Sequence, residues 1–266
     1  MPELPEVEAT RDNLARWTTG RVVVAVATDP PGSDLAPLIG HTLLGWRRRG
    51  KRLAGLTSAP VLGARTTTPP VVLVQLGMTG RLVKDAAPDR PHQRVRLTLD
   101  DGSTVALVDT RRLGRVALCR DLDEAFAGLG PDALTDRVDG PTLGRLLGLH
   151  RKVPIKTALM DQARIAGLGN IAVLEACFRA GMHPHRSLDS LGDTELARLA
   201  EGIAAHLEHT LATTLGHDEI AYVSEGGENP FLVYGREGSP CPRCEGPIAR
   251  VLASGRPSFW CPACQC

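Results

Sequence analysis

Two cysteine pairs near the end of the chain have the spacing of metal ligands. Cys241 and Cys244 form the first pair, and Cys261 and Cys264 form the second after sixteen intervening residues. Four thiolates complete a tetrahedral coordination sphere and leave no open position, which is the arrangement of a structural zinc site. The spacing therefore predicts one structural Zn²⁺.

The residues between the two cysteine pairs predict a β-hairpin that projects from the metal. The segment GPIARVLASGRPSFW indicates a strand, a glycine turn and a second strand, with Arg256 directly after Gly255 at the tip. Zinc supplies a rigidity that so small a unit cannot obtain from a core, so a basic tip is suited to reach a phosphate backbone. The alternative is a plain zinc ribbon used for protein contacts. Cys266 belongs to neither pair.

A second group of residues that could take part in a reaction stands at the start of the chain, where Pro2 and Glu3 follow Met1. We expect Met1 to be excised, which would leave Pro2 with a free secondary amine. Attack of this amine on a sugar C1′ gives an iminium ion with no N–H proton to lose, so the cation acidifies a neighbouring C–H bond. Glu3 would then donate or accept the protons. Taken alone, the two residues are more simply the start of a chain beside a helix.

Helices and strands must position both groups. Pro5 and the acidic residues around it predict a helix at the start of the chain, because proline suits the first turn and acids suit the positive end of the helix dipole. Short strands are predicted for RVVVAVAT, RLAGL, VVLVQL, RVRLTLD, TVALV and RVALC. Several short strands with turn signals between them predict a sandwich or barrel. The segments 56–71 and 84–93 are expected to be long loops.

The character of the sequence changes near residue 135, where Gly, Pro and Asp are frequent and helical periodicity begins. An amphipathic helix is predicted from the spacing of Leu196, Leu199, Ile203, Leu207 and Leu211. Upstream, PIKTALMDQ and IAVLEACFRA predict two helices joined by a glycine-containing turn, with Asn170 at the start of the second helix. The predicted domains are 1–134, 135–235 and 236–266.

Composition and charge limit the class of protein. The chain has 266 residues and a net charge of +1, and five of its seven cysteines lie between Cys241 and Cys266, which indicates a metal site in a reducing compartment. Its apolar runs are too short to span a bilayer, so we expect an intracellular protein that does not bind membranes. The basic segments RRRGKR, TRRLGR and HRKVPIK are compatible with a surface that binds a polyanion. Ordinary solvated loops are the alternative for each of them.

Several motifs occur together and in order: MPELPEVE, RRGK, QLGMTGRL, DTRRLGR, LGPDAL, the run from 155 to 184, VYGR, CPRC and RPSFWCPACQ. From Met1 to Gln265 the chain therefore resembles the formamidopyrimidine-DNA glycosylase and endonuclease VIII superfamily of base-excision repair, and MPELPEVE is more similar to the formamidopyrimidine branch. The resemblance implies an α+β fold. Its expected parts are an N-terminal β-sandwich with an N-terminal helix, and a C-terminal helix-two-turn-helix domain with a zinc-finger β-hairpin.

The resemblance also implies catalytic roles. Pro2 would be the Schiff-base nucleophile and Glu3 the general acid and base. Lys51, in the RRGK motif, would contact the lesion strand and assist catalysis, although taken alone it is one of five basic residues in that segment.

DNA-binding roles follow for six further residues. Asn170 and Arg256 would hold phosphates beside the flipped nucleotide, and Lys156 is a further candidate; a helix N-terminus such as that at Asn170 favours an anion. The gap left by the extruded base would be filled by Met78, Arg111 and Leu113. From the residues alone, Met78 would be expected in the core.

The chain departs from the pattern of the family at positions that bear on base preference. Leu113 stands where this branch usually carries Phe, and HQR at 92–94 replaces a more usual His-x-His. The loop at 56–71 is longer than usual. The segment 219–232 is shorter than in the 8-oxoguanine-specific enzymes, where it includes the loop that caps the extruded base.

The resemblance implies a bifunctional DNA glycosylase and AP lyase of base-excision repair, with an oxidised purine as the expected base. The expected partner is duplex DNA that carries a damaged base or an abasic site. We expect the protein to be a monomer in the bacterial cytoplasm, associated with the nucleoid. Two alternatives remain. One is a glycosylase for bulky alkylated or otherwise unusual lesions, and the other is a non-catalytic zinc-containing protein that binds damaged DNA.

Overall fold

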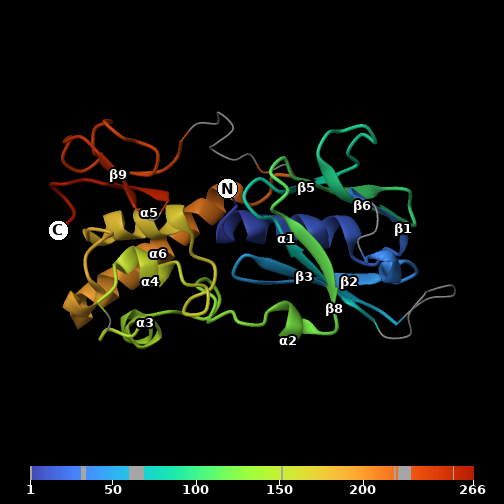
Figure 1. Ribbon diagram of the computed structural model, residues 1–266, viewed down its shortest axis with the longest axis horizontal. Helices are drawn as coiled ribbons and strands as arrows, with labels where there is room; N and C mark the ends of the chain where they lie inside the picture. The colour runs from blue at the N-terminus through green and yellow to red at the C-terminus, as the bar shows by residue number, and fades with distance from the viewer. Residues whose placement is uncertain are drawn as a thin grey trace. The chain divides into compact units, whose positions relative to one another are not determined.

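The computed structural model describes residues 2–30, 34–59, 69–150, 152–218, 220, 229–253 and 255–266 (Figure 1). The chain divides into two compact units. The first comprises Met1–Ala127 and Thr213–Gly226, and the second comprises Gly128–Ala212 and Gly227–Cys266. Among the described helices, none is both long and apolar enough to cross a membrane.

The first unit begins with the predicted helix, α1, which spans Leu4–Thr18. Pro5 stands in its first turn, and Glu3 and Glu6 form a reciprocal capping box at its N-terminus. The buried side of α1 includes Leu14 and Trp17, which belong to the main core of the unit. The start of the chain is therefore held against a packed scaffold.

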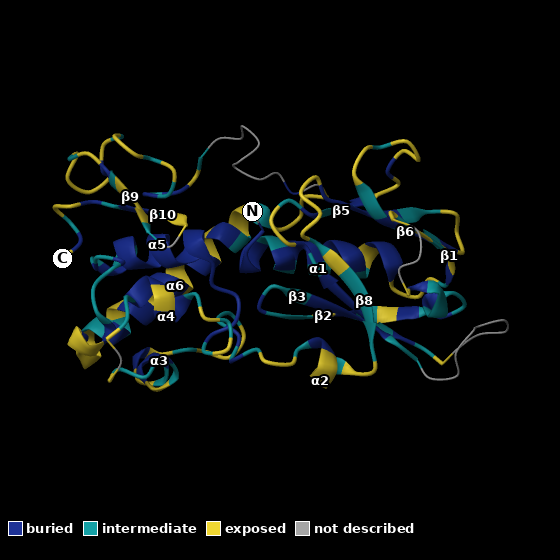
Figure 2. Ribbon diagram, viewed as in Figure 1, coloured by how far each residue is buried: buried dark blue, intermediate teal, exposed yellow. Residues whose placement is uncertain are grey.

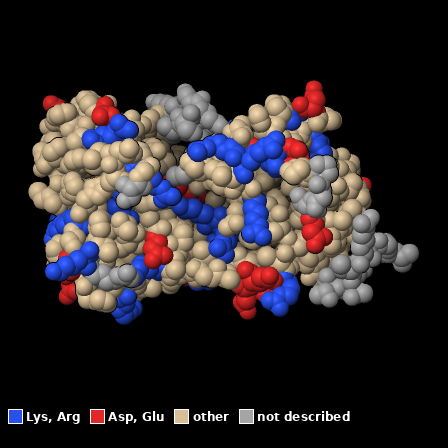
Figure 3. Space-filling model, viewed as in Figure 1, with Lys and Arg blue, Asp and Glu red and all other residues tan. Residues whose placement is uncertain are grey.

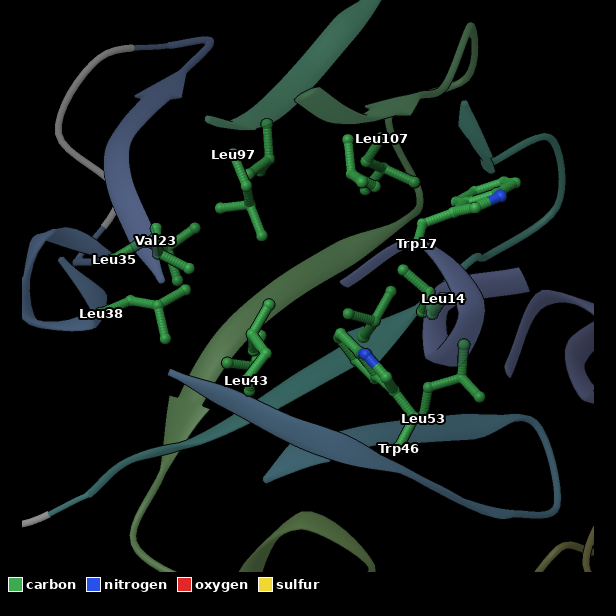
Figure 4. Packing of buried hydrophobic residues seen from close by; sticks show 14 of the residues in the cluster. Leu14, Trp17, Val23, Leu35, Leu38, Leu43, Trp46, Leu53, Leu97 and Leu107 are labelled. Carbon is green, nitrogen blue, oxygen red and sulfur yellow. The ribbon is translucent and has the colours of Figure 1, made fainter. Parts of the chain in front are cut away.

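Two four-stranded antiparallel sheets form the body of the first unit. One sheet has the order β1-β6-β7-β5 and the other the order β2-β3-β4-β8. The strands are β1 (Val23–Thr28), β2 (Leu43–Arg49), β3 (Arg52–Thr57), β4 (Val71–Gln75), β5 (Arg81–Lys84), β6 (Gln93–Leu99), β7 (Thr104–Val108) and β8 (Arg115–Cys119). Figure 4 shows apolar side chains from both sheets meeting in one core, with Leu97 and Leu107 from one sheet facing Leu43 and Trp46 from the other. The predicted sandwich is confirmed.

Two strands, β2 and β5, lie outside the predicted set. The basic segment RRRGKR is not an extended loop, because Arg47, Arg48 and Arg49 end β2 and Arg52 begins β3. Burial of Leu43 and Trp46 in the core makes β2 a strand despite its basic end. The expected loops are also shorter than predicted, because β3 continues through Thr57 and strands occupy both ends of 84–93; residues 60–68 lie outside the described part.

Helices dominate the second unit. They are α3 (Gly140–Leu147), α4 (Ile155–Leu159), α5 (Asn170–Ala180) and most of α6 (Asp193–Thr214), while the short α2 (Leu122–Ala125) belongs to the first unit. Asn170 is the first residue of α5, as predicted, and the long amphipathic helix is α6. Figure 2 shows α5 almost wholly buried. This helix is therefore the centre of the second unit.

The cysteine-rich hairpin packs against α5 within the same compact unit. Its strands, β9 (Ala249–Ala253) and β10 (Arg256–Trp260), are antiparallel, with Arg256 paired with Ala253 beside the turn. One apolar cluster joins α5 to the hairpin through Leu174, Phe178, Val233, Cys241, Ile248, Phe259 and Cys261. The metal-ligand segment is thus fixed to the helix that begins at Asn170.

Candidate functional site: a buried proline and a basic cradle

The first candidate site surrounds the N-terminal proline of the first unit. Pro2 is buried and borders an open cavity of about 250 Å³. Residues from α1, from strand β4 and from three turns complete its lining: Val7, Lys51, Gln75, Leu76, Gly77 and Leu113. The cavity therefore brings the predicted nucleophile Pro2 together with the predicted Lys51 and Leu113.

Glu3 and Glu6 hold the chain beside Pro2. The Glu3 side chain is almost fully buried, and the Glu6 carboxylate accepts a hydrogen bond of 2.9 Å from the Glu3 backbone N–H. Burial raises the pKa of Glu6, and the nearby Glu3 carboxylate adds to this effect. Glu3 thus directly follows Pro2 and is fixed by the first turn of α1.

Lys51 stands in the tight turn between β2 and β3, and a buried arginine holds that turn. Arg48 is only 2% exposed; its Nε lies 2.5 Å from Glu8 Oε2, and its Nη1 donates a 3.0 Å hydrogen bond to the Gly50 carbonyl. Glu8 belongs to α1, so this contact joins the helix behind Pro2 to the turn that carries Lys51. Loss of Glu8 would remove the carboxylate that faces the buried Arg48 guanidinium, which is costly for a buried charge.

The three predicted gap-filling residues lie on two exposed turns. Met78 is 37% exposed and Leu113 is 52% exposed, and Arg111 is also exposed. The expectation from the residues alone that Met78 lies in the core is wrong, because its glycine-flanked turn directs it to the surface. The first turn packs closely on the second, since a Cβ added to Gly77 would lie 2.6 Å from the carbonyl carbon of Leu113.

A second candidate site lies in the second unit, at the start of β10. Lys156, which is 5% exposed, donates to the Ser258 hydroxyl at 2.8 Å and to the Pro257 carbonyl at 3.1 Å. Burial, and then the nearby positive charge of Arg256, lower the pKa of Lys156 to about 8. Lys156 and Arg256 line an open cavity of about 360 Å³ together with His185. Asp161 also lines this cavity, which we call the basic cradle after Lys156 and Arg256.

Asn170 shares a backbone anchor with Lys156. Its Nδ2 donates to the Pro257 carbonyl at 3.1 Å, while its Oδ1 is buried without a hydrogen-bond partner among the described residues. The structure therefore brings Lys156, Asn170 and Arg256 together around one stretch of β10, although they are far apart in the sequence.

The four predicted metal ligands also come together. Their sulfur atoms all lie within 4.8 Å of one another, with Cys241 and Cys264 separated by 3.9 Å and Cys244 and Cys261 by 3.4 Å. Tetrahedral coordination with Zn–S bonds of about 2.3 Å requires S···S distances of about 3.8 Å. The donor set and its spacing fit Zn²⁺, which when bound would hold the hairpin in shape.

On the face shown in Figure 3, Lys and Arg form larger groups than Asp and Glu.

Three family models match the chain in order. They are the formamidopyrimidine-DNA glycosylase N-terminal domain (residues 1–116), the formamidopyrimidine-DNA glycosylase H2TH domain (residues 129–220) and a zinc finger found in FPG and IleRS (residues 238–265). The formamidopyrimidine-DNA glycosylase of Gluconobacter oxydans is 40% identical over 292 aligned positions, which cover all of both chains. The chain belongs to the formamidopyrimidine-DNA glycosylase family.

Solved structures of the family have the same fold. The crystal structure of MutM (Fpg) from Thermus thermophilus is 34% identical, with a TM-score of 0.82 over 99% of this chain and 98% of that chain. Lactococcus lactis Fpg, solved with DNA containing N7-benzyl-Fapy-dG, is 25% identical, with a TM-score of 0.84 over 99% of each chain. The predicted fold class is confirmed, and the family has DNA glycosylase and AP lyase activity.

Sequence reasoning missed the residues that hold the predicted ones in place. Glu8 and Arg48 lie inside the MPELPEVE and RRGK motifs, which is the signal that could have found them, but their pairing across 40 positions is visible only in the fold. Ser258, which accepts from Lys156, also lies within hydrogen-bond distance of His185, at 2.9 Å from its Nε2. The positions of Ser258 and His185 in the sequence give no signal that their side chains meet.

Proposed function

We propose that this member of the formamidopyrimidine-DNA glycosylase family removes an oxidised purine from duplex DNA and then cleaves the strand. The observation that carries the proposal is the open cavity bordered by Pro2 and Lys51. It gives a substrate sugar access to the secondary amine that excision of Met1 would expose. A buried acid, Glu3, follows that amine directly.

The reaction begins when the Pro2 nitrogen attacks C1′ of the damaged nucleotide. The bond between C1′ and the base breaks, the base leaves, and opening of the sugar ring gives an iminium ion between Pro2 and C1′. Loss of a proton from C2′ then expels the 3′ phosphate by β-elimination, and δ-elimination expels the 5′ phosphate. Glu3 exchanges the protons, and Lys51, which lines the same cavity as Pro2, assists. Water then hydrolyses the iminium and releases the unsaturated sugar fragment from Pro2, which leaves a one-nucleotide gap with phosphate at both ends.

DNA binding is assigned to side chains of both units. Met78, Arg111 and Leu113 fill the gap left by the extruded nucleotide, in keeping with their exposure. Lys156, Asn170 and Arg256 bind phosphates of the damaged strand, which explains why basic groups border an open cavity. Zinc held by the four cysteines keeps the hairpin rigid. We infer that the protein works as a monomer in the bacterial cytoplasm, at the nucleoid.

Incubation of the mature protein with a panel of lesion-bearing duplexes tests the proposal. Excision of oxidised purines with products phosphorylated at both ends is expected. A protein that binds these duplexes but cleaves none of them would be a non-catalytic damage-binding protein, and the proposal would fail.

A second substrate class has one specific observation in its favour. The Lactococcus lactis relative was solved with DNA containing N7-benzyl-Fapy-dG, a lesion that carries a large alkyl group. The segment of this chain that would cap the base, 219–232, lies mostly outside the described residues. Excision of bulky alkylated purines in preference to simple oxidised ones would identify this alternative.

A further inference from the structure

Two neighbouring turns of the first unit carry the three residues assigned to gap filling. Met78 lies in the turn 76–80, and Arg111 and Leu113 lie in the turn 109–114. The turns touch through their backbones, because a Cβ on Gly77 would come within 2.7 Å of backbone atoms of both Leu113 and Gly114. Gly77 also has a φ of 66°, which favours glycine. The two turns are therefore in direct backbone contact.

One buried carboxylate links the two turns. Asp109 is fully buried, and its Oδ1 accepts hydrogen bonds from the Thr79 hydroxyl and from the Arg111 N–H at 3.2 Å. Its Oδ2 accepts from the Gly114 N–H at 2.6 Å. The Thr79 hydroxyl accepts from the same Arg111 N–H, at 3.2 Å. Asp109 thus binds the residue that follows Met78 and residues on both sides of Leu113.

The negative charge of Asp109 is stabilised by the turns themselves. Burial alone would raise the pKa of Asp109, but the hydrogen bonds from Thr79 and from the backbone N–H groups of Gly114, Arg111 and Leu113 outweigh it and lower the pKa. Among the described residues, no basic side chain pairs with this carboxylate. The second turn also holds Arg112 at a φ of 56°, a conformation that residues other than glycine rarely adopt. The backbone N–H groups of Arg111 and Gly114, which donate to Asp109, lie on either side of Arg112 in this turn.

We propose that Asp109 is a positioning residue that fixes Met78, Arg111 and Leu113 in one preformed arrangement for insertion into the DNA base stack. The proposal rests on the gap-filling role assigned to these residues under the proposed function. A rigid set of side chains loses less conformational entropy on binding than three independent ones. Asp109 acts through the turns and touches neither the base nor the sugar.

The consequence is specific to duplex DNA. A single-stranded abasic site has no stack to fill, so the Schiff-base chemistry of Pro2 on that substrate does not need the preformed arrangement. Loss of Asp109 should therefore separate two activities that a general loss of folding would reduce together.

Asp109→Asn and the milder Thr79→Val are the informative variants. Thr79→Val removes only the hydroxyl bridge and leaves the hydrogen bonds that Asp109 accepts from the Arg111 and Gly114 N–H groups. Asp101→Asn is the matched control, because Asp101 is a turn carboxylate of the same unit that accepts hydrogen bonds from Ser103 but does not contact either gap-filling turn.

The first measurement compares two substrates. For Asp109→Asn and Thr79→Val, we expect kcat/KM on a lesion-bearing duplex to fall at least tenfold. Borohydride trapping on a single-stranded abasic site should stay within twofold of the unsubstituted protein, and Asp101→Asn should match that protein on both substrates. Equal losses on both substrates would show a merely structural role and would overturn the proposal.

The second measurement needs no catalysis, so it separates this proposal from the proposed function. A 2-aminopurine placed beside a tetrahydrofuran abasic analogue in a duplex brightens when the neighbouring stack is opened. We expect the unsubstituted protein to raise this fluorescence and Thr79→Val to raise it less at saturating protein. In a Met78→Ala background, Thr79→Val should add less loss than it causes in the unsubstituted protein, because one of the three side chains that the turns position is gone. Unchanged fluorescence in Thr79→Val and Asp109→Asn, or fully additive losses, would refute the positioning role even in a protein that proves catalytically inactive.

Discussion

Lys156 keeps a charged side chain in a buried position, and the pH dependence of DNA binding should reveal it. The pKa of this lysine is lowered from its usual 10.5 to about 8 by burial and then by Arg256. A phosphate placed in the cradle favours the ammonium form, so the pKa should rise in the complex and binding should take up a proton. Without DNA, the pKa of Lys156 is lower in the folded chain than in the unfolded chain. The free-energy penalty of burying the charged lysine therefore decreases as the pH rises above about 8, because the folded chain then loses this proton.

The affinity for duplex DNA should therefore weaken as the pH rises from 7 to 9.5. Fluorescence anisotropy at constant ionic strength would measure the slope, and Lys156→Met should bind more weakly with a flatter profile over this range. Equal pH slopes in the two proteins would show that Lys156 holds no phosphate.

The Arg48–Glu8 pair gives a prediction about stability in the first unit. Glu8→Gln leaves the Arg48 guanidinium buried without its carboxylate, which should lower the free energy of unfolding by about 3 kcal/mol. Glu8 also contacts Arg11 at 2.7 Å, but Arg11 is more exposed, so Arg11→Gln should cost less than about 1 kcal/mol. Urea denaturation of the two variants tests this difference. Similar losses in both would mean that the buried contact contributes no more than the surface one.

Residue types and spacing could predict the individual chemical groups but not the contacts that hold them. The cysteine pairs and the proline after Met1 are recognisable because their chemistry requires those residues at those positions. The burial of Lys156 and the hydrogen bonds of Asp109 depend on segments about 100 and 30 residues away in the chain. No local pattern encodes such separations. The roles of the site residues therefore stay predictions, although the structure brings several of them together.

At the scale of elements, periodicity was informative where one face of a segment is buried. The helix α6 and the strand β6 were predicted because their apolar residues recur at helical and alternating spacing. The strand β2 was missed because its last three residues are arginines, and β5 was missed because it has only four residues, RLVK. Both are strands because neighbouring strands pair with them, which is a tertiary cause.

The zinc hairpin carries a prediction at this scale. Cys244→Ser removes one of four ligands, so the bound zinc should fall from about one per chain to near zero and DNA affinity should drop at least tenfold. Cys266→Ser is the matched control, because the described contacts of Cys266 are made by its backbone, with Gly181 and His183. Metal analysis and DNA titration of both variants would decide. Full zinc content or full affinity in Cys244→Ser would contradict a structural site.

At the scale of the whole molecule, the net charge of +1 gives the chain no general attraction for DNA. Binding must depend on local groups such as Lys156 and Arg256, so the logarithm of the affinity should fall linearly with the logarithm of the salt concentration. Arg256→Gln should reduce this slope by about 1. Arg120→Gln should leave it unchanged, because Arg120 is already paired with Glu124. An unchanged slope for Arg256→Gln would remove Arg256 from the phosphate contacts.

The most direct test of the whole account is borohydride trapping of the mature protein, without Met1, on abasic-site DNA. Reduction should fix one covalent adduct per active chain, and peptide mapping should place it on the nitrogen of Pro2. Pro2→Gly should reduce trapping steeply while the fold and the zinc content are retained. An adduct on a lysine such as Lys51, or no adduct with any abasic or lesion-bearing duplex, would contradict the account.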